Sequence, residues 1–380
     1  MAIEGQVSTL HMAVENWQGH MPGVQYTSIG DLIVGTLRDL PKTFTDTMRQ
    51  VEYPLTRLFY TQYVSKSQGT GYEKKIRKAA KTTFQRVLPY QATATQHEDL
   101  LVAQNTPWVF FEQKMEFDDR VMKMNSGGPQ IIDMMKAERS GAYEDIFNNL
   151  EDDLASAPST SGDPRTPYGL PYWFPTLSLN TSDPTGGFNG QTIYFRDGTS
   201  STTRAGVDLS LAANARLRTF AGTYSGYTDE AFFDLLRRAM TRTNFGTLAH
   251  LEGDKPAGSS PGDMYLLASH DMCDQIAKRV NKGPDDQNGD TERFRDGQFR
   301  GVGFIRSPNF ENFAYNPVYG IKRSKTFGIV LKGGWMQEIP AQNSQATLRT
   351  YVIGITGDYN LTCDDPRSGG FCLHTVRTAA

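Results

Sequence analysis

The strongest pattern in the chain is helical and lies between residues 129 and 157. Apolar residues recur there at spacings of four and seven, which predicts one long helix with a single apolar stripe. Pro129 suits the first turn of this helix, and Pro158 ends it. A helix of this length spans about 40 Å, and such a helix usually packs against a sheet. The stripe consists of Ile131, Met135, Ala142, Ile146, Leu150 and Leu154.

A different pattern precedes the helix. Residues 72–90 and 101–117 are typical of two extended segments, which the polar turn 91–100 joins into a ribbon. The first segment has too few apolar positions to bury itself in a compact monomer, so we expect another copy of the chain to cover it. The second segment is more apolar, from Trp108 to Phe117, and is expected to enter a core. The apolar anchors of the first segment are Tyr72, Ile76, Phe84, Val87 and Leu88.

Weaker patterns predict the other elements. Residues 31–40 predict a short helix that Pro41 stops, and residues 228–245 predict a second helix. Residues 264–284 predict a strand that runs into a helix capped by Ser269. The chain then changes to strands, and the last of them are expected to return to the sheet behind the long helix. These strands are expected at residues 301–308, 318–324, 326–339 and 347–363.

Composition narrows the class of protein. The 380 residues are enough for two domains, or for one domain with large insertions. Lys and Arg total 39 while Asp and Glu total 42, and this near-neutral balance argues against a dedicated nucleic-acid binder. No run approaches the ~20 apolar residues of a membrane span, and the N-terminus shows no signal peptide, so we expect no membrane association. The three cysteines suit a reducing cytoplasm, with Cys363 and Cys372 as free thiols rather than a disulfide.

No residue set in the sequence indicates catalysis or cofactor binding. The six histidines are scattered, and the sequence contains no HExxH motif, zinc-ligand spacing or phosphate-binding glycine motif. Ser269, His270 and Asp271 are adjacent in the chain and therefore cannot form a catalytic triad. The acidic loop 285–290 departs from the EF-hand order, and a solvated loop is the better interpretation. We expect no enzyme, no metal and no cofactor.

The first segment of the ribbon carries a basic set of residues, and the second half of the long helix carries an acidic set. In order of preference, these sets are interpreted as contacts between subunits, as a solvated face of the ribbon, or as a strip that binds nucleic acid. Carboxylates near the C-terminal half of a helix oppose its dipole, and a cation from another subunit would make them better tolerated. Residues 1–37 contain no Lys or Arg, so they cannot condense a genome by charge. The basic set is Lys74, Lys75, Arg77, Lys78, Lys81 and Arg86, and the acidic set is Glu144, Asp145, Glu151, Asp152 and Asp153.

The order of these elements resembles the major capsid proteins of tailed bacteriophages, which have the Hong Kong 97-like fold. The ribbon is similar to the extended loop of that family. The helix that ends in LEDDLASAP at residues 150–158 is similar to its spine helix. Residues 169–175 (GLPYWFP), 186–190 (GGFNG) and 214–224 resemble the entry into its axial domain. Residues 299–308 resemble the strand and turn before the return to its peripheral domain.

The resemblance implies an α+β fold with an N-terminal arm, an extended loop, a peripheral domain with a long spine helix, and an axial domain. The boundaries expected from it are 1–37 for the arm, 38–68 for the start of the peripheral domain, 69–105 for the extended loop, 106–160 for the peripheral domain with the spine helix, 161–340 for the axial domain and 341–380 for the return to the peripheral domain.

The resemblance also implies a function. We expect a structural protein that self-assembles through hexamers and pentamers into the icosahedral head of a tailed bacteriophage and encloses its double-stranded DNA. The expected location is the virion, after assembly in the cytoplasm of the host bacterium. The arm is too short for a fused scaffolding domain, so a separate scaffolding protein is expected, with a portal and a cement protein as further candidate partners. The packaged DNA would be contacted weakly and non-specifically.

Two alternatives stay open at this point. One is the shell protein of a bacterial nanocompartment, similar to an encapsulin. The other, less favoured, is a carbohydrate-active enzyme, which would need two carboxylates that converge in a cleft. No Lys–Asn pair can be assigned as a crosslink, so covalent linkage of subunits is not implied.

Overall fold

The computed structural model describes residues 53–61, 63–66, 69–78, 86, 88, 101–120, 128–226, 230–243, 264–280, 298–299, 302–343 and 350–378. They belong to two compact units. Unit 1 includes Phe110–Asn149 and Gly333–Asp358, and unit 2 includes Glu52–Val109, Leu150–Lys332 and Tyr359–Ala380. The boundaries fall within helix α5 (Gly128–Ala155) and strand β17 (Thr350–Cys363), so each unit contains a part of both elements. The helix expected at residues 31–40 lies outside the described residues.

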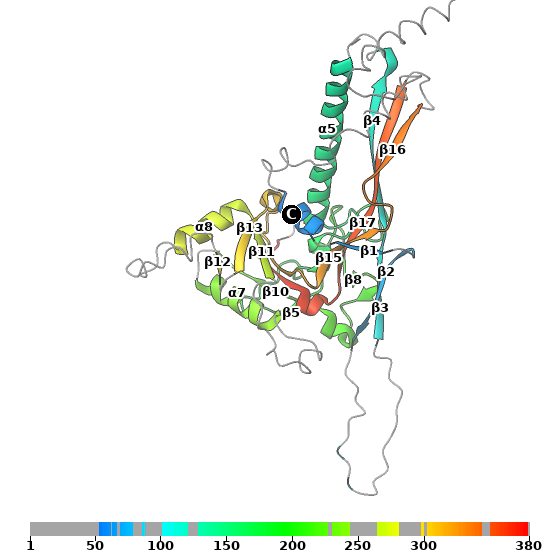
Figure 1. The fold of residues 1–380 in the computed structure, drawn as a ribbon. Coiled ribbons are helices and arrows are strands. Elements are labelled where there is room, and N and C mark those ends of the chain that lie inside the picture. The colour runs from blue at the N-terminus through cyan, green and yellow to red at the C-terminus, as the bar shows by residue number, and fades with distance from the viewer. Residues whose placement is uncertain are drawn as a thin grey trace, which may run out of the picture. The chain divides into compact units, whose positions relative to one another are not determined.

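In unit 1, the first part of α5 packs on a sheet (Figure 1). Strands β4 (Val109–Asp118) and β16 (Gln337–Asn343) both pair with β17, and β16 runs antiparallel to it. Alternate residues of β4 are exposed, as the two-residue period of a strand requires. The shared core buries Met135, Ala142 and Ile146 of the predicted stripe and Met115 and Phe117 of the apolar end of the ribbon, whereas Phe110 of that segment is exposed. The buried members of this core are Met115, Phe117, Met135, Ala142, Ile146, Ile353 and Ile355.

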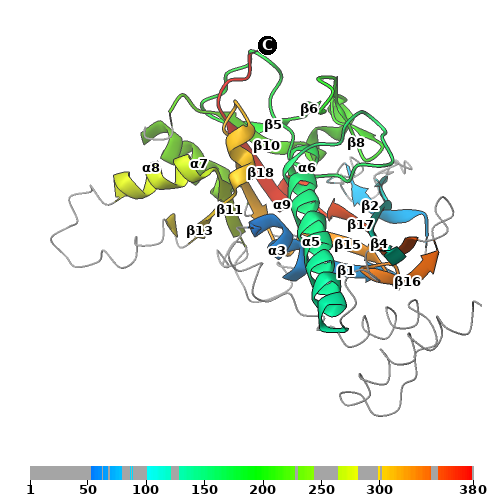
Figure 2. The same cartoon turned by 90° about the horizontal axis from the view of Figure 1, so that it is seen from above.

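Unit 2 contains a mixed sheet, which has seven strands among the described residues. Helices α7 (Glu230–Thr243) and α8 (His270–Val280) pack against this sheet and share one apolar core with it (Figure 2). The central strands β18 and β10 are buried along their whole length. In order across the sheet, the strands are β12 (Gln298–Phe299), β13 (Val302–Arg306), β11 (Met264–Ala268), β14 (Val318–Lys322), β18 (Gly370–His374), β10 (Thr219–Thr223) and β5 (Gly187–Gly190).

A second group of strands in unit 2 supports the ribbon. Strand β1 (Tyr63–Lys66) runs parallel to β15 (Thr326–Leu331), which pairs antiparallel with the last part of β17. Helix α3 (Pro54–Thr61) packs on β15 so closely that a Cβ on Gly328 would lie 2.3 Å from the ring of Phe59. The ribbon itself is an antiparallel pair of β2 (Gly71–Arg77) and β3 (Leu101–Pro107).

Short elements complete unit 2 between and after these strands. They are α6 (Leu170–Trp173), β6 (Ile193–Tyr194), β7 (Ser200–Ser201), β8 (Thr203–Arg204), β9 (Val207–Asp208), the 3₁₀ helices η1 (Ala212–Leu217) and η6 (Pro308–Asn312), and α9 (Pro366–Gly369).

The predicted helices that fall within the described residues are confirmed, because each has a local pattern and a local stop signal. The helices expected at 129–157 and 228–245 correspond to α5 and α7. The strand and helix expected at 264–284 correspond to β11 and α8. The N–H of Cys273 donates to the backbone carbonyl of Ser269 at 3.1 Å, which places Ser269 at the start of α8. The extended segment expected at 101–117 is divided at Trp108 into β3 and β4.

The end of the chain differs from the expectation. Strand β17 does return beside α5 in unit 1, but the chain then continues into β18, which lies between β14 and β10 in the seven-stranded sheet. The physical reason is the apolar run at residues 371–373, because a central strand is covered on both faces and buries every residue. Cys363 and Cys372 are both buried free thiols.

Candidate functional site

The basic set follows the ribbon, and strand geometry divides it between two faces. Side chains alternate along β2, so that Lys75 and Arg77 are exposed while Lys74 between them is partly buried. Beyond the strand, Lys78 is partly buried, Arg86 is exposed, and Lys81 lies outside the described residues. The exposed face of β2 is therefore the part of the described basic set that another molecule can reach most directly.

Lys74 has a partner in its own chain, where the sequence suggested one in a neighbouring subunit. Its ammonium contacts a carboxylate oxygen of Asp364, and the Tyr72 hydroxyl donates to the other oxygen at 3.0 Å. Burial and the charge of Asp364 raise the pKa of Tyr72 to about 12. The cluster ties the start of the ribbon to the end of β17.

Glu151 of the acidic set is a buried cap rather than a surface charge. Its side chain is 2% exposed, and its two oxygens accept the N–H groups of Leu55 at 3.1 Å and Thr56 at 2.7 Å. These N–H groups lie in the first turn of α3, where a helix has no acceptors of its own and favours negative charge. Burial raises the pKa of Glu151, although the two backbone hydrogen bonds act in the opposite direction. A cation from another subunit cannot reach this carboxylate.

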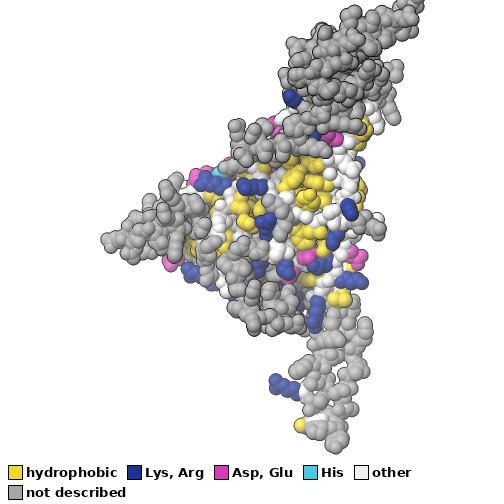
Figure 3. Space-filling model, viewed as in Figure 1, with side chains coloured by type: hydrophobic (Ala, Val, Ile, Leu, Met, Phe, Trp, Pro, Cys, Tyr) yellow, Lys and Arg dark blue, Asp and Glu magenta, His cyan; other side chains and the backbone are white. Residues whose placement is uncertain are grey.

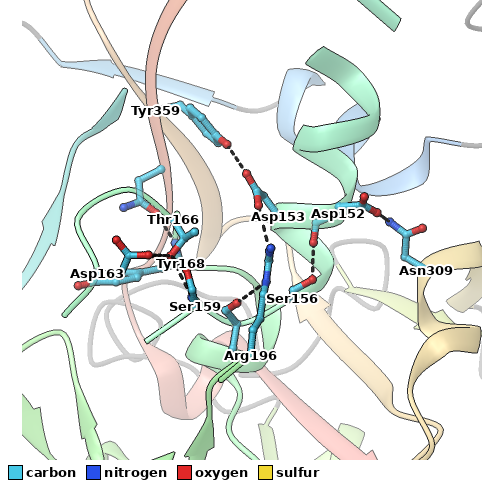
Figure 4. Close-up of polar contacts among 12 residues, drawn as sticks. Asp152, Asp153, Ser156, Ser159, Asp163, Thr166, Tyr168, Arg196, Asn309 and Tyr359 are labelled. Atoms are coloured by element: carbon cyan, nitrogen blue, oxygen red, sulfur yellow. Dashed lines mark hydrogen bonds and ion pairs between the residues drawn. The ribbon is translucent and has the colours of Figure 1, made fainter. Parts of the chain in front are cut away.

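Asp153 is held by two side chains of its own unit (Figure 4). Arg196 donates to one carboxylate oxygen at 2.9 Å, and the Tyr359 hydroxyl donates to the other at 3.0 Å. Arg196 also donates to the carbonyl of Ala157 at 3.0 Å, just beyond the C-terminus of α5. The cation that this helix end requires is thus supplied within the chain. Burial raises the pKa of Asp153, and Arg196 opposes that shift.

The other carboxylates of the acidic set lie nearer to solvent. Asp152 is exposed and accepts a hydrogen bond from the Asn309 amide at 2.7 Å (Figure 4). Asp145 is exposed on the part of α5 that belongs to unit 1, and Glu144 beside it is partly exposed. These carboxylates, unlike Glu151, are accessible to a partner.

We also searched the described residues for a metal site, a basic patch and a membrane-spanning helix. Among the described residues, no group of His, Cys, Asp or Glu side chains is placed to hold a metal ion. On the face drawn in Figure 3, Lys and Arg side chains are scattered among acidic and uncharged ones rather than gathered in one patch. No helix in the described part of the chain has both the length and the apolar character needed to cross a bilayer.

Comparison with known proteins gives no match in sequence and clear matches in structure. No family model matches the chain, and no curated protein matches it. The capsid subunit of cyanophage A-1(L) is 12% identical and has a TM-score of 0.57, with 90% of this chain and 95% of that chain covered. The capsid of Myoviridae phage XM1 is 11% identical, with a TM-score of 0.49 and coverage of 93% and 99%.

The chain has the Hong Kong 97-like fold of phage capsid proteins. This confirms the fold class expected from the sequence, including its mixture of helices and strands. In this capsid fold, sequence reasoning missed Arg196, Tyr359 and Asp364, which hold members of the charged sets. No sequence signal links these residues to their partners. Glu151, in contrast, follows Phe147 by four positions and precedes Leu154 by three, so its place on the buried face could have been found.

Proposed function

We propose that this chain is the shell subunit of a bacteriophage capsid. It assembles through hexamers and pentamers into the icosahedral head that encloses the double-stranded DNA genome of a tailed phage. The observation that carries this proposal is the likeness to a cyanophage capsid subunit over 90% of the chain. The proposal keeps the division into an arm (1–37), an extended loop (69–105), a peripheral domain with the spine helix (106–160) and an axial domain (161–340).

In this proposal, contact between subunits uses the exposed members of the two charged sets. Lys75, Arg77 and the basic residues beyond them on the ribbon approach Asp145 and Asp152 of an adjacent subunit. Single exposed ion pairs contribute only about 0–1 kcal/mol each. Their role is therefore to fix the register between subunits and to make the rate of assembly sensitive to salt. Lys74, Glu151 and Asp153 are excluded from this role because each is held inside its own chain.

The proposed partners follow from the same role. A separate scaffolding protein directs assembly in the host cytoplasm, a portal occupies one vertex, and a cement protein is a further candidate. The subunit performs no catalysis. The near-neutral charge supports weak, salt-sensitive and non-specific contact with DNA, and a filter-binding measurement at physiological salt tests this directly.

Electron microscopy of the purified full-length chain tests the proposal. We expect closed hollow particles, and a chain that stays monomeric over a wide range of salt and protein concentration would contradict the shell function. If the isolated particles contain protein cargo and no DNA, the nanocompartment shell would be favoured over the phage head.

A shortened variant tests whether the ribbon is needed for assembly. Replacing residues 79–100 with a short Gly-Ser turn keeps both paired strands β2 and β3. The variant should unfold at the same denaturant concentration as the parent but fail to close particles. Normal particles from this variant would show that the ribbon is not an assembly element.

A further inference from the structure

Helix α7 of unit 2 presents two arginines to the loop that precedes β5. Arg238 and Arg242 are four residues apart and exposed, so they lie one turn apart on the same face of the helix. Arg238 donates to the carbonyl of Thr185 at 2.6 Å, and Arg242 donates to the carbonyl of Gly186 at 3.4 Å. Neither guanidinium contacts a carboxylate of the described residues, so both positive charges remain without a counter-charge.

The loop under these arginines is packed closely on α7. Gly186 has a φ of 64°, and a Cβ at this position would lie 2.7 Å from the side chain of Leu235, so the backbone approaches the helix as only a glycine permits. Asp183 closes the same loop, because its carboxylate accepts the N–H groups of Thr185 at 3.2 Å and Gly186 at 2.9 Å and the Asn189 amide at 2.6 Å. The charge of Asp183 is thus engaged by its own loop.

Two further arginines adjoin this surface. Helix α9 packs against both α7 and η1, and the guanidinium of its Arg367 lies 3.9 Å from the ring centroid of Phe188 in β5. Burial lowers the pKa of Arg367, and the charge of the exposed Arg216 on η1 acts in the same direction. Asp365 opposes this shift, and its carboxylate also accepts the Ser368 hydroxyl at 2.5 Å. Positive charge therefore exceeds negative charge on this part of unit 2.

We propose that this arginine surface binds the phosphate backbone of double-stranded DNA. A guanidinium has five N–H donors in a planar fork, so an arginine that holds a carbonyl or covers a ring keeps further donors for a phosphate oxygen. Phosphates recur every ~3.4 Å along each strand of the duplex, so arginines one helical turn apart reach phosphates of one strand. The arginine surface consists of Arg216, Arg238, Arg242 and Arg367.

The chemistry of the surface favours DNA over an acidic protein. Contact with phosphates needs exposed cations alone, whereas a protein interface is centred on apolar and aromatic side chains. Phe188, the aromatic residue of β5, is already covered by Arg367. Phosphate contacts carry no base readout, so DNA of any sequence suits the surface. This inference rests on the proposed shell function, and it assigns the weak contact with the packaged DNA to unit 2 rather than to the ribbon.

Binding of a short DNA duplex to free full-length subunits tests the arginine surface, with fluorescence anisotropy read over a range of salt concentration. Each phosphate contact contributes about 0.9 to the slope of log K against log salt. With four contacts, the parent should bind about 150-fold more weakly at about 200 mM than at about 50 mM salt, and Arg238→Gln with Arg242→Gln should reduce this factor to about 12. Arg238→Lys with Arg242→Lys keeps both charges and should keep the slope of the parent.

A matched control removes two exposed charges elsewhere in unit 2. Arg165→Gln with Lys332→Gln should leave the slope unchanged. Where the double glutamine variant of α7 does not fold, Arg216→Gln at an exposed position should lower the slope by about 0.9.

Two results would overturn the proposal. One is a glutamine variant that unfolds at the midpoint of the parent and retains its slope. The other is preferential binding of polyglutamate, which would assign the surface to an acidic protein partner. Particle formation is scored separately by electron microscopy, so closed particles together with an unchanged slope would reject the arginine surface and leave the shell function standing.

Discussion

The seven-stranded sheet and the ribbon lie in the same compact unit but are held in different ways. In the sheet, every residue of β10 and β18 is buried, and helices α7 and α8 close the core. In the ribbon, β2 alternates between partly buried and exposed residues, and polar contacts to β17 fix its base. The sheet therefore draws its stability from the burial of a large apolar area, whereas the ribbon is positioned by a few polar groups and by the packing of Ile76 and Val102 on a small buried cluster.

This difference decides what can change each region. A buried apolar strand responds to volume and hardly at all to salt or charge. A polar contact at the surface contributes little to stability but is altered by a single substitution or by ionic strength. The proposed shell function would use both properties, one region to keep the subunit folded and the other to contact neighbouring subunits.

A substitution in the core of the seven-stranded sheet should have the largest effect on the free energy of unfolding. Phe371 is 0% exposed, and its ring fills the space over Gly320, where a Cβ would lie 2.2 Å from it. Phe371→Ala should lower the free energy of unfolding by about 3–5 kcal/mol, measured by denaturant titration of the subunit. Phe110 is 68% exposed, so Phe110→Ala is the matched control and should change it by less than about 0.5 kcal/mol. Equal effects from the two would contradict the burial assignment.

Loss of a buried polar contact should lower the free energy of unfolding by an amount between those for Phe371→Ala and Phe110→Ala. Glu151→Ala leaves the N–H groups of Leu55 and Thr56 buried without an acceptor and should cost about 3 kcal/mol. Glu151→Gln keeps an acceptor and should stay within about 1 kcal/mol of the parent at neutral pH. Because its pKa is raised above the usual 4.5, the contribution of Glu151 to stability is complete below that pH and decreases as the pH rises through the folded-state pKa. Glu151→Gln should remove this dependence in a urea titration at several pH values.

The sheet also contains one polar group that should make it sensitive to acid. His374 ends β18, is 0% exposed, and accepts the N–H of Leu177 at 3.2 Å through Nε2. Its Nδ1 lies 2.6 Å from the carbonyl of Thr375, its ring meets the Tyr315 ring edge-on, and the guanidinium of Arg377 lies over that tyrosine ring. Burial, helped by the charge of Arg377, lowers the pKa of His374 from 6.5 to about 4.

The sign of the pH effect follows from that shift. The contribution of neutral His374 is complete above pH 6.5 and is lost as the pH falls toward 4, because the unfolded chain binds the proton more readily. Between about pH 7.5 and about pH 5 the parent should lose about 2 kcal/mol relative to His374→Gln. Parallel curves for the two proteins in denaturant titrations would show that His374 is not the responsive group.

The sequence predicted those parts of the fold that depend on local patterns. Helix α5 was expected at 129–157 and lies at Gly128–Ala155, because a repeating apolar stripe and flanking prolines are all local signals. The position of β18 could not be predicted in this way. Its apolar residues show that it is buried, but which sheet covers it depends on strands about 50 and 150 residues earlier in the chain.

The candidate site was predictable only as two charged sets. Their composition is visible in the sequence, but the partners of individual members are not. Thr56 and Glu151 are 95 residues apart, and Lys74 and Asp364 are 290 residues apart. Local spacing cannot reveal such pairs, so residues that serve the fold and residues at the surface were placed in the same set.

Charge reversal on the ribbon should have the smallest effect on the free energy of unfolding but should clearly slow assembly. Lys75→Glu with Arg77→Glu reverses the charge of the exposed face of β2, and the free energy of unfolding should change by less than about 0.5 kcal/mol. The rate of particle formation, followed by light scattering, should fall and should lose its dependence on salt. Asp145→Lys with Asp152→Lys should partly restore the rate, whereas Glu73→Gln on the same face should leave it near that of the parent. If the double reversal assembles at the parent's rate, the exposed cations of the ribbon have no acidic partner on a neighbouring subunit, and the register between subunits must be set by other contacts.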